Sequence, residues 1–175
     1  MIRLSVFLIA LFFVASSLDA QRPLPETDDE YEKIYQRRIQ KEMLYGVYIP
    51  KDLGDAFGQL NRLIDKETQA KFKSLPEGIA AQKLHFSFGR WMMHNWGFYG
   101  GSRLSHYLRG IGLSYPDDMA YFLIVTYHRN LNRNKLAVKE LLASIQEKRA
   151  AKEKDRKLQG EVIFEEKRIR PKEEN

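Results

Sequence analysis

A nearly unbroken apolar segment, Met119 to Tyr127, constrains the fold more than any other part of the sequence, because only Thr126 interrupts it. Pro116-Asp117-Asp118 comes just before it, and a proline followed by acidic residues is typical of the first turn of a helix. A helix that is apolar on every side is normally surrounded by other elements. We therefore expect this helix at the centre of an all-α fold, a compact multi-helix domain.

Capping residues followed by apolar positions at helical spacing predict further helices. The first starts at Thr27, which has Glu30 three residues later, and ends near Tyr45-Gly46. Its single apolar stripe among many charges indicates that it either lies on the surface of the main domain or becomes ordered only on a partner.

Three more helices are predicted before the glycine-rich turn at residues 97–101. Asp52 and Asp65 each cap one, and Ser74 with Glu77 has the capping-box spacing that starts a long helix running to about Asn95. Gly78 and Gly89 weaken that long helix, so we expect a neighbouring backbone to pack closely against it.

A glycine-rich turn, residues 97–101, ends the long helix, and Ser102 caps the next one, which ends at Gly110 and Gly112. After Asn132 a few apolar residues can dock about three turns of a last helix, which then becomes almost entirely charged. Val162-Ile163-Phe164 is a short apolar patch in the remaining tail.

The sequence therefore divides into a core domain with two extensions. We expect a signal peptide at residues 1–20, a linker and helix at 21–46, the helical core domain at 47–132, and a charged C-terminal helix with a disordered tail at 133–175. The fold class is thus all-α, with a helical N-terminal extension and a charged helical C-terminal extension.

The first twenty residues have the pattern of a secretory signal. Arg3 precedes an apolar run from Leu4 to Ala15 that only Ser5 interrupts, and small or polar residues lead to Ala20. The run is shorter than the roughly 20 residues that span a bilayer, although a retained membrane anchor is the alternative interpretation. We expect export to the periplasm or the extracellular space and no transmembrane segment after signal removal.

Composition excludes several classes of function. The chain has no cysteine, which rules out disulfides and thiolate zinc sites and fits a soluble bacterial envelope or extracellular protein. The net charge is +6, but from residue 133 onward 13 basic residues are mixed with 9 acidic ones. A nucleic-acid binder more often gathers positive charge and exposed aromatics on one face, so we expect no nucleic acid. No sequence motif implies a cofactor.

The four histidines and two neighbouring aspartates raise the question of a metal site. His85 and His94 lie nine residues apart, on opposite sides of one helix, and no pair has the i, i+4 spacing of a helical metal clamp. We expect no local metal site, although several helices together can still assemble one. Asp117 and Asp118 are interpreted as helix caps, because acid–base work would need a pocket and a raised pKa.

Two other segments offer charged or flexible groups at helix ends. Gly100 to Arg103 can hold a carboxylate or phosphate at a helix N-terminus, although an ordinary capped turn with the same residues is the favoured interpretation. His128-Arg129 lies at a helix C-terminus, where cations stabilise the helix whether or not they face a pocket. No nucleophile motif accompanies these residues, so a hydrolase is unsupported.

Several short segments carry a resemblance to a known family: His85, Gly89, Asn95-Trp96-Gly97, Gly101-Ser102-Arg103-Leu104, Gly112, Pro116-Asp117-Asp118-Met119 and Tyr127-His128-Arg129-Asn130-Leu131. On these residues, about Ile49 to Asn132 resembles the bacterial family known as domain of unknown function 6794. The resemblance implies a small exported bacterial protein and brings no activity with it.

Two hypotheses of function follow. The first is a non-enzymatic protein-binding module of the cell envelope, with a surface framed by Trp96, Phe98, Tyr99 and Arg103. The second is a small-ligand-binding protein or enzyme that uses an interhelical pocket around His85, Arg103, Asp117 and His128. The candidate ligand- or partner-binding residues are His85, Asn95, Trp96, Phe98, Tyr99, Ser102, Arg103, Asp117, Asp118, His128 and Arg129.

Overall fold

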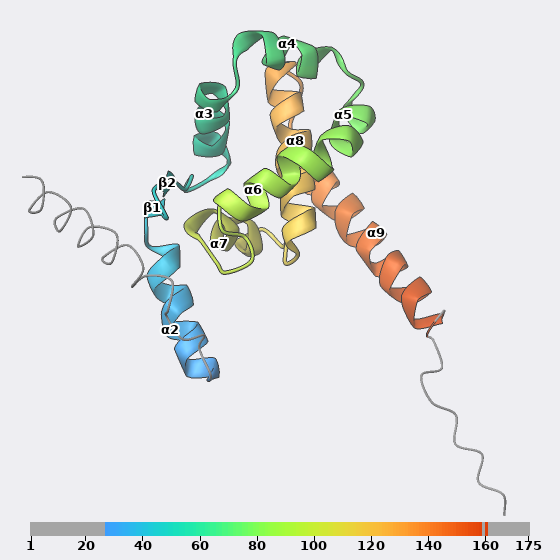
Figure 1. The fold of residues 1–175 in the computed structure, drawn as a ribbon. Helices are drawn as coiled ribbons and strands as arrows, with labels where there is room; N and C mark the ends of the chain where they lie inside the picture. Colours follow the sequence, from blue (N-terminus) through green and yellow to red (C-terminus); the bar gives the residue numbers. More distant parts are fainter. Residues whose placement is uncertain (1–26, 159, 161–175) are drawn as a thin grey trace, which may run out of the picture.

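A computed structural model of the protein describes residues 27–158 and residue 160, and in this part the chain is helical apart from one small hairpin (Figure 1). The predicted all-α fold class is therefore confirmed. The elements, in chain order, are α2 (Asp28–Ile39), β1 (Met43–Leu44), β2 (Val47–Tyr48), α3 (Leu53–Leu63), α4 (Lys66–Ser74), α5 (Glu77–Leu84), the π-helical segment η2 (His85–Gly89), α6 (Arg90–Asn95), α7 (Arg103–Gly110), α8 (Pro116–Leu131) and α9 (Val138–Leu158).

Helix α8 is the centre of the core, and α3 to α7, η2 and α9 pack against it. Its residues from Met119 to His128 are buried, with the exception of Tyr121. Burial extends to Thr126, whose hydroxyl donates a 2.7 Å hydrogen bond to the Phe122 carbonyl and so needs no partner outside the helix. The expectation of a central, surrounded helix is therefore confirmed, and Tyr121 marks the one side of this segment that other elements leave partly open.

Most of the predicted helix starts are confirmed by capping hydrogen bonds. The side chains of Thr27, Asp52 and Asp65 each accept a bond from the backbone N–H three residues later, at 3.3, 2.9 and 2.9 Å. Ser102 forms a reciprocal capping box with Ser105, in which Ser105 Oγ accepts a 2.8 Å bond from the Ser102 N–H. These caps depend on residues close in sequence, which is why the sequence predicts them well.

The predicted cap at Ser74 is wrong. Ser74 is the last residue of α4, and its hydroxyl donates to the Lys71 carbonyl at 2.8 Å. Helix α5 starts instead after Pro76, without any side-chain cap. Its first residue, Glu77, forms an ion pair with Arg129 at the far end of α8, instead of the capping-box contact with Ser74 that the sequence predicted.

The long helix that was expected to reach Asn95 is present as α5, η2 and α6, but η2 is a π-helical turn that the sequence did not predict. Gly89 ends this turn and is buried against Ala120 and Ile124 of α8: an added Cβ would lie 3.5 and 3.6 Å from their side chains. The neighbours of Gly89 are thus side chains rather than backbone. Gly78 has nothing within 4 Å of its Cβ position, so the expected close packing there is wrong.

The N-terminal helix ends earlier than expected. Helix α2 stops at Ile39, and the segment up to Tyr48 forms a two-stranded antiparallel hairpin in which Met43 pairs with Tyr48. Tyr45 and Gly46, at its turn, have φ values of +51° and +79°, the left-handed pair that a tight hairpin turn requires. Of the two alternatives for α2, the structure shows the helix lying on the surface of the domain, against α7.

The described part of the C-terminal extension contains one long helix, α9, that leaves the core (Figure 1). Leu141 and Ile145 of α9 are buried, as the sequence predicted, and the charged part from Lys148 continues as helix to Leu158 (Figure 1). In the described part of the chain no helix is both long and apolar enough to cross a bilayer. The expected signal peptide at residues 1–20, the patch at Val162-Ile163-Phe164 and the rest of the tail lie outside the described residues.

Candidate functional site

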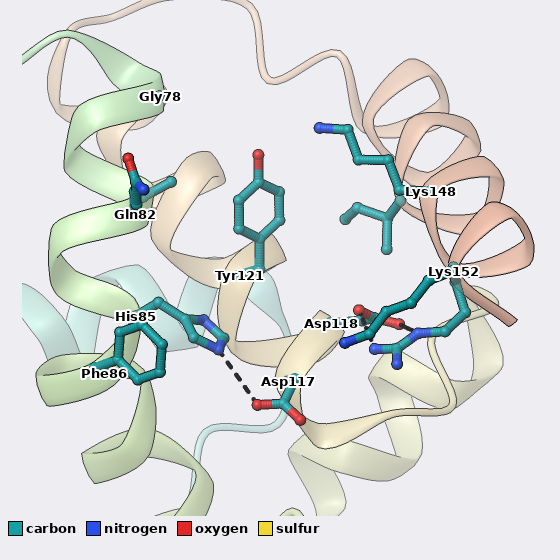
Figure 2. Close-up of a pocket in the computed structure, with 12 residues that line it drawn as sticks. Gly78, Gln82, His85, Phe86, Asp117, Asp118, Tyr121, Lys148 and Lys152 are labelled. Carbon is teal, nitrogen blue, oxygen red and sulfur yellow. Dashed lines mark hydrogen bonds and ion pairs between the residues drawn. The ribbon is translucent and has the colours of Figure 1, made fainter. Parts of the chain in front are cut away.

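An open groove of about 710 Å³ lies between α5 and η2 on one side, α8 at its floor and α9 on the other side (Figure 2). Its lining combines apolar, acidic and basic side chains: Gly78, Ala81, Gln82, His85, Phe86, Asp117, Asp118, Tyr121, Ile145, Lys148, Arg149 and Lys152. We refer to this feature as the α5–α8–α9 groove. Its volume falls within the range of roughly 300–1,000 Å³ that is typical of ligand pockets.

His85 and Asp117, two of the predicted site residues, meet in this groove. His85 Nε2 lies 3.3 Å from Asp117 Oδ1, and the Asp117 side chain is 63% exposed, so this carboxylate is open to the groove (Figure 2). The other ring nitrogen, Nδ1, is buried without a hydrogen-bond partner in the described part of the chain. The π-helical turn begins at His85, and such turns are frequent at functional sites.

Asp118, the neighbouring predicted residue, is held by α9. Its carboxylate accepts two hydrogen bonds from Arg149, at 2.9 Å from Nε and 2.6 Å from Nη2, and this bond raises the pKa of the Arg149 guanidinium. The Arg149 guanidinium also lies over the Tyr115 ring, 4.2 Å from its centroid. Both aspartates lie in the first turn of α8, as predicted, where their negative charge meets the helix dipole, but neither side chain forms a capping hydrogen bond.

The other groove residues were missed at the sequence level. Phe86 is 76% exposed at the edge of the groove, and Tyr121 is the half-buried side chain on α8. Lys148 lies on α9 with its amine 6.0 Å from the Tyr121 ring centroid, and Lys152 follows one turn later. The i, i+4 spacing of the two lysines was visible in the sequence, but only the packing of α9 on α8 shows that they face the groove.

The surface expected around the glycine-rich turn does not exist as proposed. Trp96, Phe98 and Ser102 are completely buried, and Asn95 is used within its own helix, where its amide donates a 2.9 Å bond to the Trp91 carbonyl. Tyr99 alone is exposed there, at 69%. Because buried aromatic rings pack the core, they cannot offer a contact surface to a partner, and this part of the site prediction is wrong.

Arg103 is turned away from the helix N-terminus that was expected to hold an anion. Its Nε donates a 2.6 Å bond to the Ile49 carbonyl, and its guanidinium lies 5.0 Å from the Tyr48 ring centroid. Nη1 also lies 3.2 Å from Glu42. Arg103 therefore fastens the hairpin to α7, and the favoured interpretation of this segment as an ordinary capped turn agrees with the structure.

His128 and Arg129 lie at the opposite end of α8 from the groove. His128 is buried, and its Nε2 is 2.9 Å from the Leu75 carbonyl oxygen. Arg129 donates to both carboxylate oxygens of Glu77, at 2.8 and 2.7 Å, and to the Leu136 carbonyl. These contacts join helix ends, so the pocket imagined around His85, Arg103, Asp117 and His128 is not assembled; only His85 and Asp117 come together.

No cluster of three or more His, Asp or Glu side chains that could hold a metal ion occurs among residues 27–158 and 160. The groove lining contains a histidine–aspartate pair but no serine or threonine beside it. Carboxylate, imidazole and ammonium groups in one open groove can contact charged groups of a ligand.

The comparison with protein families places most of this site in one domain. Residues 49–131 match the model of the family described as Domain of unknown function (DUF6794). These residues form a DUF6794 domain. The domain covers α3 to α8, in agreement with the resemblance drawn from the sequence, whereas α2, the hairpin and α9 lie outside it. No curated protein and no solved structure shows a significant match to the chain.

The groove thus has two origins. The DUF6794 domain contributes α5, η2 and α8, with the pair His85 and Asp117, and the segment beyond it contributes Lys148, Arg149 and Lys152 on α9. A DUF6794 domain without this helix would lack the basic side of the groove.

Proposed function

We propose that the protein is an exported, non-enzymatic binding module of the bacterial cell envelope, and that it binds an acidic segment of a protein partner in the α5–α8–α9 groove. The observation that carries the proposal is the combination, in one open groove, of an apolar floor and a basic rim. Export is inferred from the signal-like pattern of residues 1–20.

The rim supplies positive charge that the protein itself leaves uncompensated. Lys148 and Lys152 form no ion pair with any residue that the structure describes, whereas the nearby Arg149 is neutralised by Asp118. Two free ammonium groups four residues apart can pair with carboxylates of a bound chain, which favours an acidic partner.

The floor supplies apolar contact area for the same ligand. The half-buried Tyr121 ring on α8 and the Phe86 ring at the edge of the groove, most of which is in solvent, form this apolar area, whereas the lining residues Ala81 and Ile145 are buried. Exposed aromatic side chains of this kind are common anchors of protein interfaces. The partner segment should therefore carry apolar or aromatic side chains between its acidic ones.

Charge reversal at the rim tests this proposal. The variant Lys148→Glu/Lys152→Glu should lose at least ten-fold in retention of the envelope partner, because two attractive charges become repulsive ones. The matched control is Lys154→Glu/Lys157→Glu, which makes the same change on exposed positions of α9 that do not line the groove.

Retention of the partner by quantitative pull-down should be lost in the first variant and kept in the second, with equal helicity by circular dichroism. Equal loss in both variants would show that only the overall charge of α9 matters. Full retention of the partner by both variants would show that the basic rim of the groove does not bind it.

A small ligand in the same groove is the second candidate, and the His85–Asp117 pair with its 3.3 Å separation is the observation that favours it. A bound anion or polar molecule could contact both side chains. Native mass spectrometry of the chain isolated gently from its host's envelope fraction distinguishes the two. A stoichiometric protein companion supports the partner, and a mass excess of small-molecule size supports the small ligand.

A further inference from the structure

A second surface, which shares no residue with the groove lining, lies where α2 rests on the turn between α6 and α7. We define this turn surface by Gly97, Gly100, Gly101, His106 and Arg109, which contact two side chains of α2. Helix α2 itself lies outside the DUF6794 domain, and the hairpin alone connects it to α3 (Figure 1). Two side chains of α2, Tyr35 and Arg38, contact this surface, and Arg38 also contacts the hairpin, where its Nη1 donates a 2.9 Å hydrogen bond to the Tyr45 hydroxyl.

Tyr35 makes the first contact. Its ring lies on the backbone of Gly101 so closely that a Cβ there would be 2.7 Å from Cε2. The hydroxyl is 2.9 Å from His106 Nδ1, and the Arg109 guanidinium lies 5.4 Å from the ring centroid. The ring is thus held by a bare glycine backbone, a cation and a polar partner for its hydroxyl.

Arg38, three residues later on the same face of α2, makes the second contact. Its Nε donates a 2.8 Å bond to the Gly101 carbonyl, and its guanidinium lies against Gly97 and Gly100, where a Cβ would be only 3.1 and 3.3 Å from Nη2. Glycine at these positions lets a flat guanidinium approach the turn. The turn therefore presents a carbonyl acceptor to a cation, which is the opposite of the anion site considered from the sequence.

Helix α2 differs from the helices of the core in the burial of its residues. No residue of α2 is buried, whereas Leu104, Ser105 and Leu108 of α7 and nine residues of α8 are. A segment with few buried contacts belongs to the low-stability end of a structure and can open without unfolding the core.

We propose that the turn surface is a binding site for a helix that carries tyrosine and arginine three residues apart, and that α2 is its displaceable occupant. The site recognises the phenol through Gly101 and His106 and the guanidinium through the Gly101 carbonyl. Because α2 is tethered, its effective concentration at the turn surface is in the millimolar range. A second copy of the helix therefore binds only when the contacts of the tethered α2 with this surface are weakened.

The test uses the full chain and the double variant Tyr35→Ala/Arg38→Ala. Hydrogen exchange of the α2 amides should become at least ten-fold faster in this variant, with protection of α8 unchanged. A fluorescent peptide of residues 27–42 should then bind the variant at least ten-fold more tightly than it binds the wild-type chain. The same peptide with both alanine changes should not bind.

The control variant is Tyr31→Ala/Arg37→Ala, which removes the same side-chain types from exposed positions of α2 and should behave like the wild-type chain. Unchanged α2 protection in Tyr35→Ala/Arg38→Ala, or failure of the peptide to bind it, would overturn the proposal. A loss of α8 protection together with that of α2 would also overturn it, because α2 would then be an integral part of the core.

Discussion

At the scale of single residues, Glu77 and Arg129 join the start of α5 to the end of α8. The hydrogen bonds from Arg129 lower the pKa of the Glu77 carboxyl, and their effect exceeds that of burial, which acts in the opposite direction. A carboxyl whose pKa is lower in the folded than in the unfolded state, where it is about 4.3, stabilises the fold above that value. This stabilisation is lost as the pH falls through the folded-state pKa.

Glu77→Gln should therefore reduce the free energy of unfolding at pH 7 by about 1 kcal/mol, less than the roughly 1.5–3 kcal/mol of a charged hydrogen bond because the Glu77 side chain is 37% exposed. The difference from wild type should shrink at pH 3, which lies below the unfolded-state pKa, because the stabilisation is progressively lost as the pH falls from there through the lowered folded-state pKa. Urea unfolding at both pH values measures it. A difference that stays equal at both would contradict the assignment of this pair.

Phe98 and Tyr99 are adjacent but should respond very differently to truncation. Phe98 is fully buried, so Phe98→Ala should cost about 3–5 kcal/mol through lost packing and a cavity. Tyr99 is mostly exposed, and its hydroxyl makes only a 3.5 Å contact with the Met93 sulfur, so Tyr99→Ala should change stability by about 0.5 kcal/mol or less. Denaturant midpoints test both, and similar costs for the two variants would contradict the structure.

At the scale of helices and strands, the sequence predicts a feature well when the residues that cause it lie close together along the chain. Thr27, Asp52, Asp65 and Ser102 cap helices through backbone groups three residues away, and all four starts were predictable. Glu77 has the same spacing from Ser74, but its partner is Arg129, 52 residues later. A local pattern does not reveal that a distant charge competes for the same side chain.

The π-helical turn and the early end of α2 escaped prediction for the same reason. Gly89 lets Ala120 and Ile124 of α8 approach, and neither this distant contact nor the π-helical turn that ends at Gly89 is visible in the helical spacing of the segment. Tyr45, a bulky residue with positive φ, gives no sequence signal for a hairpin turn, although Gly46 after it does. The candidate site followed this pattern: His85 and Asp117 were named, whereas Lys148 and Lys152 needed the packing of α9.

Gly78 allows a test of the packing around α5. It is exposed in the first turn of that helix, with open space where a Cβ would stand. Gly78→Ala should therefore stabilise the protein by about 0.5 kcal/mol, because alanine loses less backbone freedom in a helix. Thermal unfolding should show a slightly raised Tm. A lowered Tm would mean that a neighbour packs against this position after all.

At the scale of the whole molecule, a DUF6794 domain is extended at both ends, and each extension lies against a different face of it. Helix α9 completes the groove, and α2 covers the turn surface between α6 and α7. The domain supplies the apolar floor and the His85–Asp117 pair, and the charge of the rim comes from outside it. If the groove binds a partner as proposed, binding specificity is a property of the extended chain, and the domain alone should lack it.

The most direct test of the binding groove places a photocrosslinking amino acid, p-benzoylphenylalanine, at position 86, in cells that make the full chain. The same amino acid at position 63, where Leu63 is 51% exposed and lies outside both the groove lining and the turn surface, is the control. We predict one partner that is crosslinked from position 86, is absent from position 63, and is lost in the Lys148→Glu/Lys152→Glu background. Equal crosslinking from both positions, or crosslinking from 86 that is indifferent to the two lysines, would contradict it.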